Sequence, residues 1–449
     1  MRFFITAIMG FLLMHTQAQN VSGTWKGELS IQGMKLPLVF HISQQGGMIS
    51  ATMDSPAQGA KDINVDSAGW VDNRLDLVVS GIGLRYTGKM EGKDSIAGTF
   101  TQRNVSLPLG LARSTDSIPK LRRPQTPKPP FDYHIEEVTL KNEQQGNTLA
   151  GTLTTPSGTG KFPVVVMITG SGAQDRDETI FGHKPFWVMA DYLARHGIAS
   201  LRLDDRGVGG SSAGKAHPTT ADFVTDIDAA VNYLAAKGFQ SIGLLGHSEG
   251  GLIAPRVANK NKQVQFIISL AGPGVPIDTL MIRQLEASLK LAKIPEAAAA
   301  ANIAIVTEAY RFNNSYTGNH FKADLEKHLM QQFPLTGELN KAVASQIGMP
   351  WFAYFARQNP QTDIQQLKIP VLALNGSLDF QVDAAQNLKG WKSSLEKGGN
   401  KQFEIMELPG LNHLFQEAQT GAASEYGTIE QTLSPQVLQI ITNWILKKR

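Results

Sequence analysis

Cysteine is absent from this chain of 449 residues. Its absence excludes disulfide bonds, thiolate nucleophiles and zinc sites built on cysteine. An excess of charge of either sign is also lacking, because the formal net charge is only +3. No basic stripe is interleaved with aromatic residues, so no nucleic acid partner is expected. Stability must therefore come from hydrophobic cores, which a chain of this length and 42% hydrophobic content can form.

Long hydrophobic runs are lacking except at the N-terminus. There Arg2 precedes an apolar run from Phe3 to Met14, and the small residues Thr16 and Ala18 suit positions −3 and −1 of a cleavage site. The run is too short to span a membrane, so residues 1–18 are predicted to be an export signal. No cysteine follows for a lipid anchor, and no later run predicts a membrane span in the mature protein. We expect the bacterial periplasm or exterior, and the sequence leaves the oligomeric state open.

The pattern along the chain divides it into three parts after the signal. Residues 19–112 hold short alternating runs between glycines, which predict a small antiparallel β domain, a barrel or a sandwich. Gly23-Thr24-Trp25 is similar to the start of lipocalin-like barrels, although a core role is the simpler expectation for Trp25. Five prolines in residues 113–132 predict a stiff extended spacer whose basic residues serve solvation.

Residues 133–449 have the pattern of an α/β domain. They begin with a predicted β hairpin and continue with short apolar strands, several of them separated by helical segments. Near-continuous apolar strands alternating with helices predict a mostly parallel sheet with helices on both faces. Residues from about 275 to 367 show no strand pattern, and their Ala-rich and amphipathic runs predict a helical cap over the carboxyl edge of that sheet.

Two serines fit the pattern G-x-S-x-G. Ser248 lies in GHSEGG, directly after the apolar strand pattern SIGLLG and before the helical pattern LIAPRVAN. That context predicts a nucleophile elbow, a strained strand-to-helix turn that exposes the hydroxyl and requires small residues on either side. Ser212 lies in GSSAG within a polar loop that starts no helix. Ser248 is therefore the predicted nucleophile.

The order of the elements then suggests its partners. The strand pattern PVLALNG is followed by Asp379 and Asp383, and Asp379 is favoured because it stands closer to the carboxyl end of the strand. His413 is the one histidine of the sequence after Asp379. It is the predicted base, whereas His247, next to the serine, is expected to serve packing.

An ester-cleaving serine also needs N–H groups that bind the oxyanion. One is expected from the backbone of Glu249, and the other from Ser171 or Gly172 in the loop after VVVMITG. No metal or organic cofactor is expected. The aromatic residues of the cap segment fit either the packing of a cap helix or an apolar acyl or aryl pocket. They are Trp351, Phe352, Tyr354 and Phe355.

Taken together, residues from about 133 to 449 resemble α/β-hydrolases of the serine esterase group. Besides GHSEGG, the segment LDDRGVGGS (203–211) is similar to the D-x-R-G-x-G-x-S loop of that superfamily, and GSGAQDRD (170–177) resembles bacterial esterases with an extra N-terminal β domain. The resemblance implies a catalytic triad of Ser248, Asp379 and His413, with oxyanion roles for Ser171 and Glu249. It implies hydrolysis of small-molecule carboxylic esters through an acyl-enzyme, by a carboxylesterase.

The same fold also serves other functions. A serine peptidase, a compact aminopeptidase above all, or a thioesterase would use the same residues. A prolyl-oligopeptidase would need a propeller that 112 residues cannot form, and a dehalogenase would need aspartate at position 248. A nucleotide-binding P-loop is excluded because both near matches lack the final hydroxyl residue, having Ala216 and Met90 there. A non-enzymatic binding module is disfavoured, since all three triad residues are in place.

Overall fold

The computed structural model describes residues 20–31, 34–45, 48–56, 60–102, 105–114 and 122–447. The predicted export signal, residues 1–18, lies outside the described residues. The chain divides into two compact units, one up to Pro119 and one from Lys120. In the described ranges, no helix combines the length and the apolar character needed to cross a bilayer.

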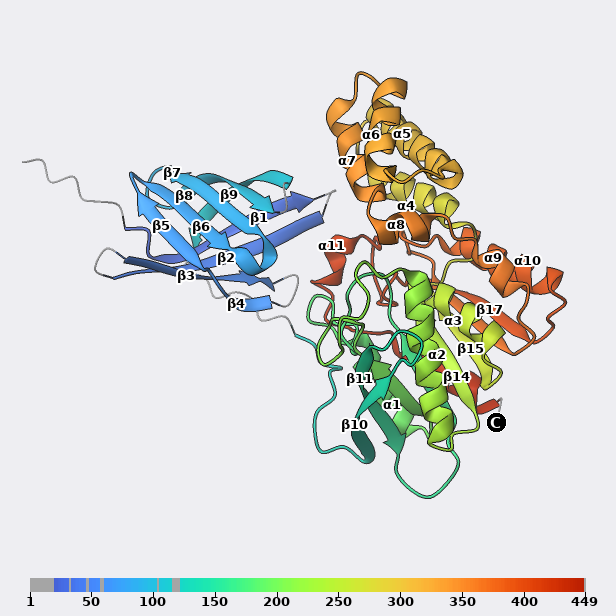
Figure 1. Ribbon diagram of the computed structural model, residues 1–449. Coiled ribbons are helices and arrows are strands. Elements are labelled where there is room, and N and C mark those ends of the chain that lie inside the picture. Colours follow the sequence, from blue (N-terminus) through green and yellow to red (C-terminus); the bar gives the residue numbers. More distant parts are fainter. Residues whose placement is uncertain are drawn as a thin grey trace, which may run out of the picture. The chain divides into compact units, whose positions relative to one another are not determined.

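The first unit is all β in its described part, as predicted. One nine-stranded antiparallel sheet has the strand order β4-β3-β2-β1-β9-β8-β7-β6-β5 (blue in Figure 1). β3 also contacts β5, so this is a single curled sheet rather than a sandwich of two sheets. The strands are β1 (Gly23–Ile31), β2 (Met34–Gln45), β3 (Met48–Ser55), β4 (Ala60–Asn64), β5 (Ser67–Val71), β6 (Arg74–Val79), β7 (Leu84–Met90), β8 (Ser95–Gln102) and β9 (Val105–Ser114).

Alternation along the strands gives this unit its core. In β6, Leu75, Leu77 and Val79 are buried while the residues between them are not. Trp25 is fully buried and its indole N–H donates to the carbonyl oxygen of Val21 at 2.7 Å. The concave side is therefore filled by side chains, and Trp25 is a core residue, as expected.

The second unit is built on a mixed, mostly parallel sheet, as predicted. Its described residues form an eight-stranded sheet with the order β10-β11-β13-β12-β14-β15-β16-β17. β10 and β11 form the predicted antiparallel hairpin, and the strands from β12 to β17 run parallel. The strands are β10 (Tyr133–Lys141), β11 (Thr148–Pro156), β12 (Val164–Ile168), β13 (Ala199–Leu203), β14 (Ile242–His247), β15 (Val264–Leu270), β16 (Val371–Gly376) and β17 (Phe403–Leu408).

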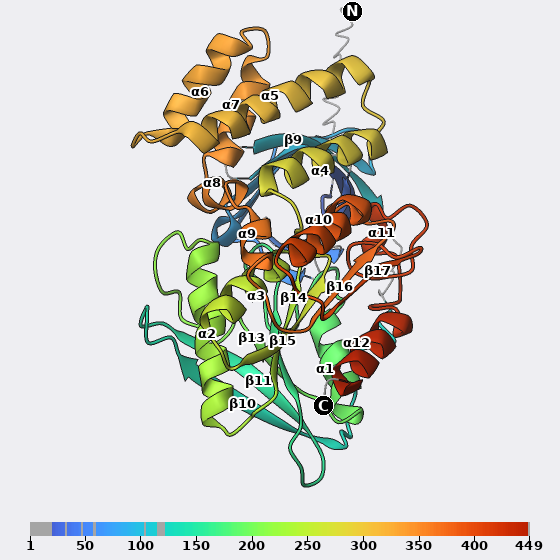
Figure 2. The ribbon, with the colours of Figure 1, turned by 90° about the vertical axis from the view of Figure 1, so that its right-hand side faces the viewer.

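Helices cover both faces of this sheet, because its central strands are apolar on both sides. Within β12, Val164, Val166 and Ile168 join the core formed with α2, α3 and α10, whereas Val165 and Met167 join the core formed with α1 and α12. Figure 2 shows α1 and α12 close together near the end of the chain. The helices are α1 (Pro185–Arg195), α2 (Thr220–Ala236), α3 (Glu249–Lys260), α10 (Ala384–Lys397), α11 (Ala423–Tyr426) and α12 (Pro435–Lys447).

The insertion between β15 and β16 is helical, as predicted. It has a core of its own around Ile305, Leu325 and Leu329, and Figure 2 shows α5, α6 and α7 grouped away from the sheet. The short helix α8 joins this group to the rest of the unit, since it contacts α2 as well as α4 and α7. The helices are α4 (Ile277–Leu291), α5 (Glu296–Ser315), α6 (Phe321–Gln332), α7 (Gly337–Ile347), α8 (Pro350–Ala356) and α9 (Pro360–Ile364).

The proline-rich segment differs from the spacer that the sequence predicts. Arg123 donates to the backbone carbonyl oxygens of Phe181, Gly427 and Ile429 at 2.7 to 3.1 Å. The side chain of Gln125 donates to the carbonyl of Leu433 at 2.8 Å. This part of the segment therefore packs on the second unit, and Arg123 has a structural role instead of serving solvation.

Candidate active site

Ser248 occupies the sharp turn between β14 and α3. Its backbone has φ 53° and ψ −117°, a conformation that is strained for a residue with a side chain. The flanking glycines are required by space: a Cβ at Gly246 would lie 2.1 Å from the carbonyl oxygen of Gly250, and one at Gly250 would lie 2.3 Å from that of Ile168. The local geometry is that of a nucleophile elbow.

Ser212, the rival serine, is in a different setting. Its hydroxyl accepts a hydrogen bond from the backbone N–H of Thr148 at 2.9 Å, in an exposed loop. This hydrogen bond joins the loop to the start of β11. Ser212 does not line the cavity that contains Ser248.

Asp379 and His413 meet as the order of elements suggests. Asp379 follows β16 and His413 follows β17, and His413 Nδ1 lies 2.8 Å from Asp379 Oδ2. The other carboxylate oxygen of Asp379 accepts the backbone N–H groups of Gln381 and Val382, each at 2.8 Å. Both side chains are buried, with relative exposures of 6% for Asp379 and 4% for His413. The carboxylate is thus fixed by backbone donors and directed at the imidazole.

Asp383 does not take part in this contact. Its carboxylate accepts the backbone N–H of Gln386 at 2.9 Å and so caps the start of α10. Its other oxygen lies 3.4 Å from the guanidinium of Arg283. The choice between the two carboxylates therefore falls on Asp379.

Ser248 and His413 line the same cavity, of about 250 Å³, between the sheet and the cap. Trp351, Phe352 and Phe355 of α8 line it as well, whereas Tyr354, also predicted there, does not. On a helix with about 100° between successive residues, positions 351, 355 and 352 share an arc of about 100°, and position 354 lies outside it. Among the residues that line the cavity, the apolar ones outnumber the charged ones. The other apolar side chains of the lining are Ile180, Pro273, Leu280, Met281, Val382 and Leu414.

The loop after β12 brings backbone amides to this cavity. The N–H of Gly170 is engaged, since it donates to Glu178 Oε1 at 2.8 Å. Ser171 lines the cavity, whereas Gly172 lines a separate space of about 30 Å³. Among the described residues, the N–H groups of Ser171 and Glu249 donate to no protein acceptor. Of Ser171 and Gly172, the two residues that the sequence suggests for the second oxyanion amide, Ser171 is the one that lines this cavity.

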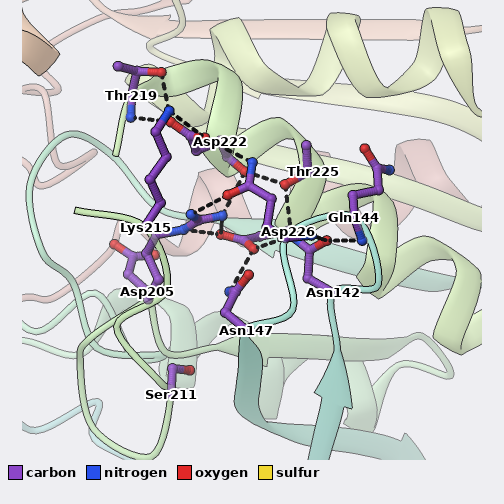
Figure 3. Close-up of polar contacts among 12 residues, drawn as sticks. Asn142, Gln144, Asn147, Asp205, Ser211, Lys215, Thr219, Asp222, Thr225 and Asp226 are labelled. Carbon is purple, nitrogen blue, oxygen red and sulfur yellow. Dashed lines mark hydrogen bonds and ion pairs between the residues drawn. The ribbon is translucent and has the colours of Figure 1, made fainter. Parts of the chain in front are cut away.

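Charged residues of the two loop motifs hold these loops by pairing with one another. Arg176 donates to both carboxylate oxygens of Asp204 at 3.0 and 2.7 Å, and Asp177 pairs with buried Arg202. Arg206 is enclosed by Asp226 at 2.7 Å and by the carbonyl oxygen of Asp222 at 2.9 Å. Figure 3 shows the same carboxylate of Asp226 receiving the amides of Asn142 and Asn147.

Two residues that line the cavity have contacts that the sequence does not predict: it suggests no role for Glu178 and a packing role for His247. Glu178 and His247 are both buried, both line the cavity and are hydrogen-bonded to each other at 2.9 Å. The one signal for Glu178 in the sequence is its place at the end of the charged segment GSGAQDRDE. In the described part of the chain, no group of three or more His, Asp or Glu side chains is arranged to hold a metal ion.

Fold and site together define the protein as an α/β-hydrolase: a mostly parallel sheet has helices on both faces, and a serine elbow lines the same cavity as a histidine that is bonded to an aspartate. The chain belongs to the family described as serine aminopeptidase, S33, whose model matches residues 186–418.

The chain is also similar to individual proteins named as esterases or hydrolases. It is 27% identical over 321 residues to Esterase EstD of Thermotoga maritima, which covers 70% of each chain. Among solved structures, an esterase of Pyrococcus furiosus has 16% identity, covers 70% of this chain and 91% of its own, and has a TM-score of 0.44. E-2-(acetamidomethylene)succinate hydrolase has 17% identity, covers 70% and 99%, and has a TM-score of 0.41.

Proposed function

We propose that the protein is an exported serine hydrolase that cleaves carboxylic esters of small molecules through an acyl-enzyme. The observation that carries the proposal is the cavity that Ser248 and His413 share, with His413 held by Asp379 at 2.8 Å. The name of the relative Esterase EstD supports the ester as the bond that is cleaved. Export rests on residues 1–18 alone and would be tested by sequencing the N-terminus of protein recovered outside the cytoplasm.

The proposed mechanism has two steps. His413 accepts the Ser248 proton through Nε2 while Ser248 Oγ attacks the ester carbon, and Asp379 holds Nδ1–H and stabilises the imidazolium. The N–H groups of Ser171 and Glu249 bind the oxyanion. The tetrahedral intermediate then expels the alcohol, which takes the proton from His413. A water molecule, deprotonated by His413, attacks the acyl-enzyme and releases the acid with Ser248 restored.

The lining of the cavity favours an ester over the alternatives. An aminopeptidase must bind a free ammonium group, for which an unpaired carboxylate is the natural partner. Glu178 is the acidic residue in the lining, and it is already engaged by His247 and by the N–H of Gly170. The described lining has no lysine or arginine that would bind the phosphates of a carrier thioester. An uncharged ester suits these walls best.

Two serine variants test the proposal directly. Ser248→Ala should lower kcat on a p-nitrophenyl ester by at least about 10³-fold, because it removes the nucleophile. Ser212→Ala is the matched control and should stay within about twofold of the unmodified protein. Comparable activity of the two variants would refute the assignment. Faster turnover of aminoacyl anilides than of aryl esters would instead favour the aminopeptidase.

A further inference from the structure

A buried glutamate and a buried histidine, Glu178 and His247, contact each other and the backbone of His413. Glu178 is in the loop after β12, and His247 is the last residue of β14, immediately before Ser248. His247 Nδ1 lies 2.9 Å from Glu178 Oε1, and Nε2 lies 3.0 Å from the backbone carbonyl oxygen of His413. The rings of His247 and His413 have their centres 4.8 Å apart. The pair therefore touches both the loop of the base and the strand that ends at the nucleophile.

The hydrogen bonds of His247 favour its charged form. A carbonyl oxygen only accepts, so Nε2 must carry a proton in order to bond to His413. Glu178 Oε1 accepts the N–H of Gly170 and shares a hydrogen bond with His247 Nδ1. An imidazolium, with a proton on each ring nitrogen, satisfies both contacts of His247. Burial alone would lower the pKa of His247, yet the neighbouring Glu178 carboxylate raises it above its ordinary value.

The Glu178–His247 pair lowers the stability of the fold in two ways, through backbone strain and through burial of polar groups. Glu178 has a positive φ of 52°, which strains a residue that carries a side chain, and its side chain is buried. A buried ion pair contributes little net stability compared with apolar residues of similar size. Strained and buried charges that line a substrate cavity are typical of functional positions, so a purely structural role explains this pair poorly.

We infer that Glu178 and His247 are positioning residues, which hold the backbone of His413 and the oxyanion loop in register with Ser248 and place a fixed positive charge beside the base. The inference rests on the proposed function. The bond to the His413 carbonyl fixes the loop that carries the imidazole, and the bond to the Gly170 N–H fixes the residue before Ser171. A positive charge on His247 repels a second positive charge on His413, whose ring centre lies 4.8 Å away.

Other charged groups face this cluster and set its balance. Asp379 faces His413 from the loop after β16, and its charge also acts on His247. Burial raises the pKa of Asp205, in the loop after β13, to about 7, and the charges of Glu178 and Glu249 act in the same direction.

The test compares three variants on p-nitrophenyl acetate across pH. His247→Gln keeps an amide that can donate to the His413 carbonyl but removes the charge, and Glu178→Gln keeps an acceptor for Gly170 and removes the counter-charge. Each should lower kcat about 10- to 10²-fold with KM within about twofold, because the reacting groups lose their alignment. In His247→Gln the acidic limb of the pH–rate profile should also move to higher pH. The double variant should lose no more than the worse single one, since the two residues act as a unit.

His183→Gln is the matched control. His183 is another buried histidine, with hydrogen-bond contacts to Thr432, to the carbonyl oxygen of Tyr426 and to the side-chain amide of Gln416, but it lies outside the cavity lining. It should leave the pH–rate profile unchanged. If His247→Gln and Glu178→Gln both keep kcat within twofold and the unmodified pH profile, the inference is overturned. If His247→Gln does not fold, the kcat of Glu178→Gln alone decides. Loss of activity in these variants while Ser248→Ala stays active would overturn the proposed function instead.

Discussion

At the scale of single residues, Asp379 and Asp383 follow the same strand but are bonded to different partners. Asp379 holds His413 and accepts two backbone N–H groups, whereas Asp383 caps α10. A carboxylate that orients a base must accept from one specific ring nitrogen, while a helix cap accepts equally well through an amide oxygen. Replacing aspartate by asparagine should therefore damage catalysis at position 379 and have little effect at position 383.

Asp379→Asn is expected to lower kcat about 10³- to 10⁴-fold, because an amide can stabilise the wrong tautomer of His413 and cannot stabilise its charged form. Asp383→Asn should leave kcat within about twofold, since asparagine caps a helix as well as aspartate does. Ester hydrolysis and thermal unfolding of both variants would measure this. A larger loss of kcat in Asp383→Asn would exclude Asp379 as the partner of His413.

The residues proposed for the triad could be located from the sequence because each follows a recognisable element. Ser248 follows an apolar strand and precedes a helix, and Asp379 and His413 stand after later strands. Glu178 and His247 could not be paired in this way. Their contact joins residues 69 positions apart, and it depends on how a loop folds back over β14. Local pattern holds no information on such a contact, so His247 was expected to serve only packing.

At the scale of elements, one hydrogen bond ties the cap to the elbow. The indole N–H of Trp351 in α8 donates to Glu249 Oε1 at 3.2 Å, and the hydroxyl of Thr220 in α2 donates to the same atom at 2.6 Å. Burial raises the pKa of Glu249, which favours a neutral carboxyl next to the proposed oxyanion site. The ring of Trp351 stacks on Phe355 with centres 5.0 Å apart. The side chain of Glu249 thus links α2, α3 and α8.

Trp351→Phe should remove this link while a ring remains to stack on Phe355. Losing one hydrogen bond of about 1 kcal/mol should raise KM for esters with longer acyl chains several-fold, because the cap wall is less firmly held. The kcat for an acetate ester should change little. Tyr354→Phe, on the same helix but outside the cavity lining, is the control. Equal KM values of the two variants across acyl lengths would count against a role for the link.

The sequence predicts the position and burial of the strands, but for the cap helices it predicts the position only. Strands such as β14 and β16 are apolar runs that end near glycine, so the sequence marks where they lie and that both their faces are buried. The cap was predictable as helical from its composition. Which of its side chains reach the cavity was not, because an aromatic cluster on a short helix does not reveal which arc faces the site. Trp351 lines the cavity and Tyr354, three residues later on the same helix, does not.

At the scale of the whole molecule, the division into two units determines what can be removed. The groups proposed to react all lie in the unit from Lys120 onward, and the first unit has its own filled core. The sequence alone suggests a cut near Phe131, at the end of the proline-rich segment. Arg123 and Gln125 argue against that cut, because both are bonded to loops of the second unit that surround α11 and precede α12.

A chain beginning at Lys120 should therefore fold and keep kcat for p-nitrophenyl acetate within about twofold of the full chain. A chain beginning at Phe131 loses the hydrogen bonds of Arg123 to three carbonyl groups and those of Gln125 to Thr432 and Leu433. Bonds from a charged donor contribute about 1.5 to 3 kcal/mol and neutral ones about 1, so Tm should fall by about 5 °C or more. Thermal unfolding of the two chains, with Arg123→Met in the full chain as a partial control, measures the difference. Equal Tm values would show that the segment adds no stability. A folded but inactive chain from Lys120 would show that the first unit is needed for catalysis.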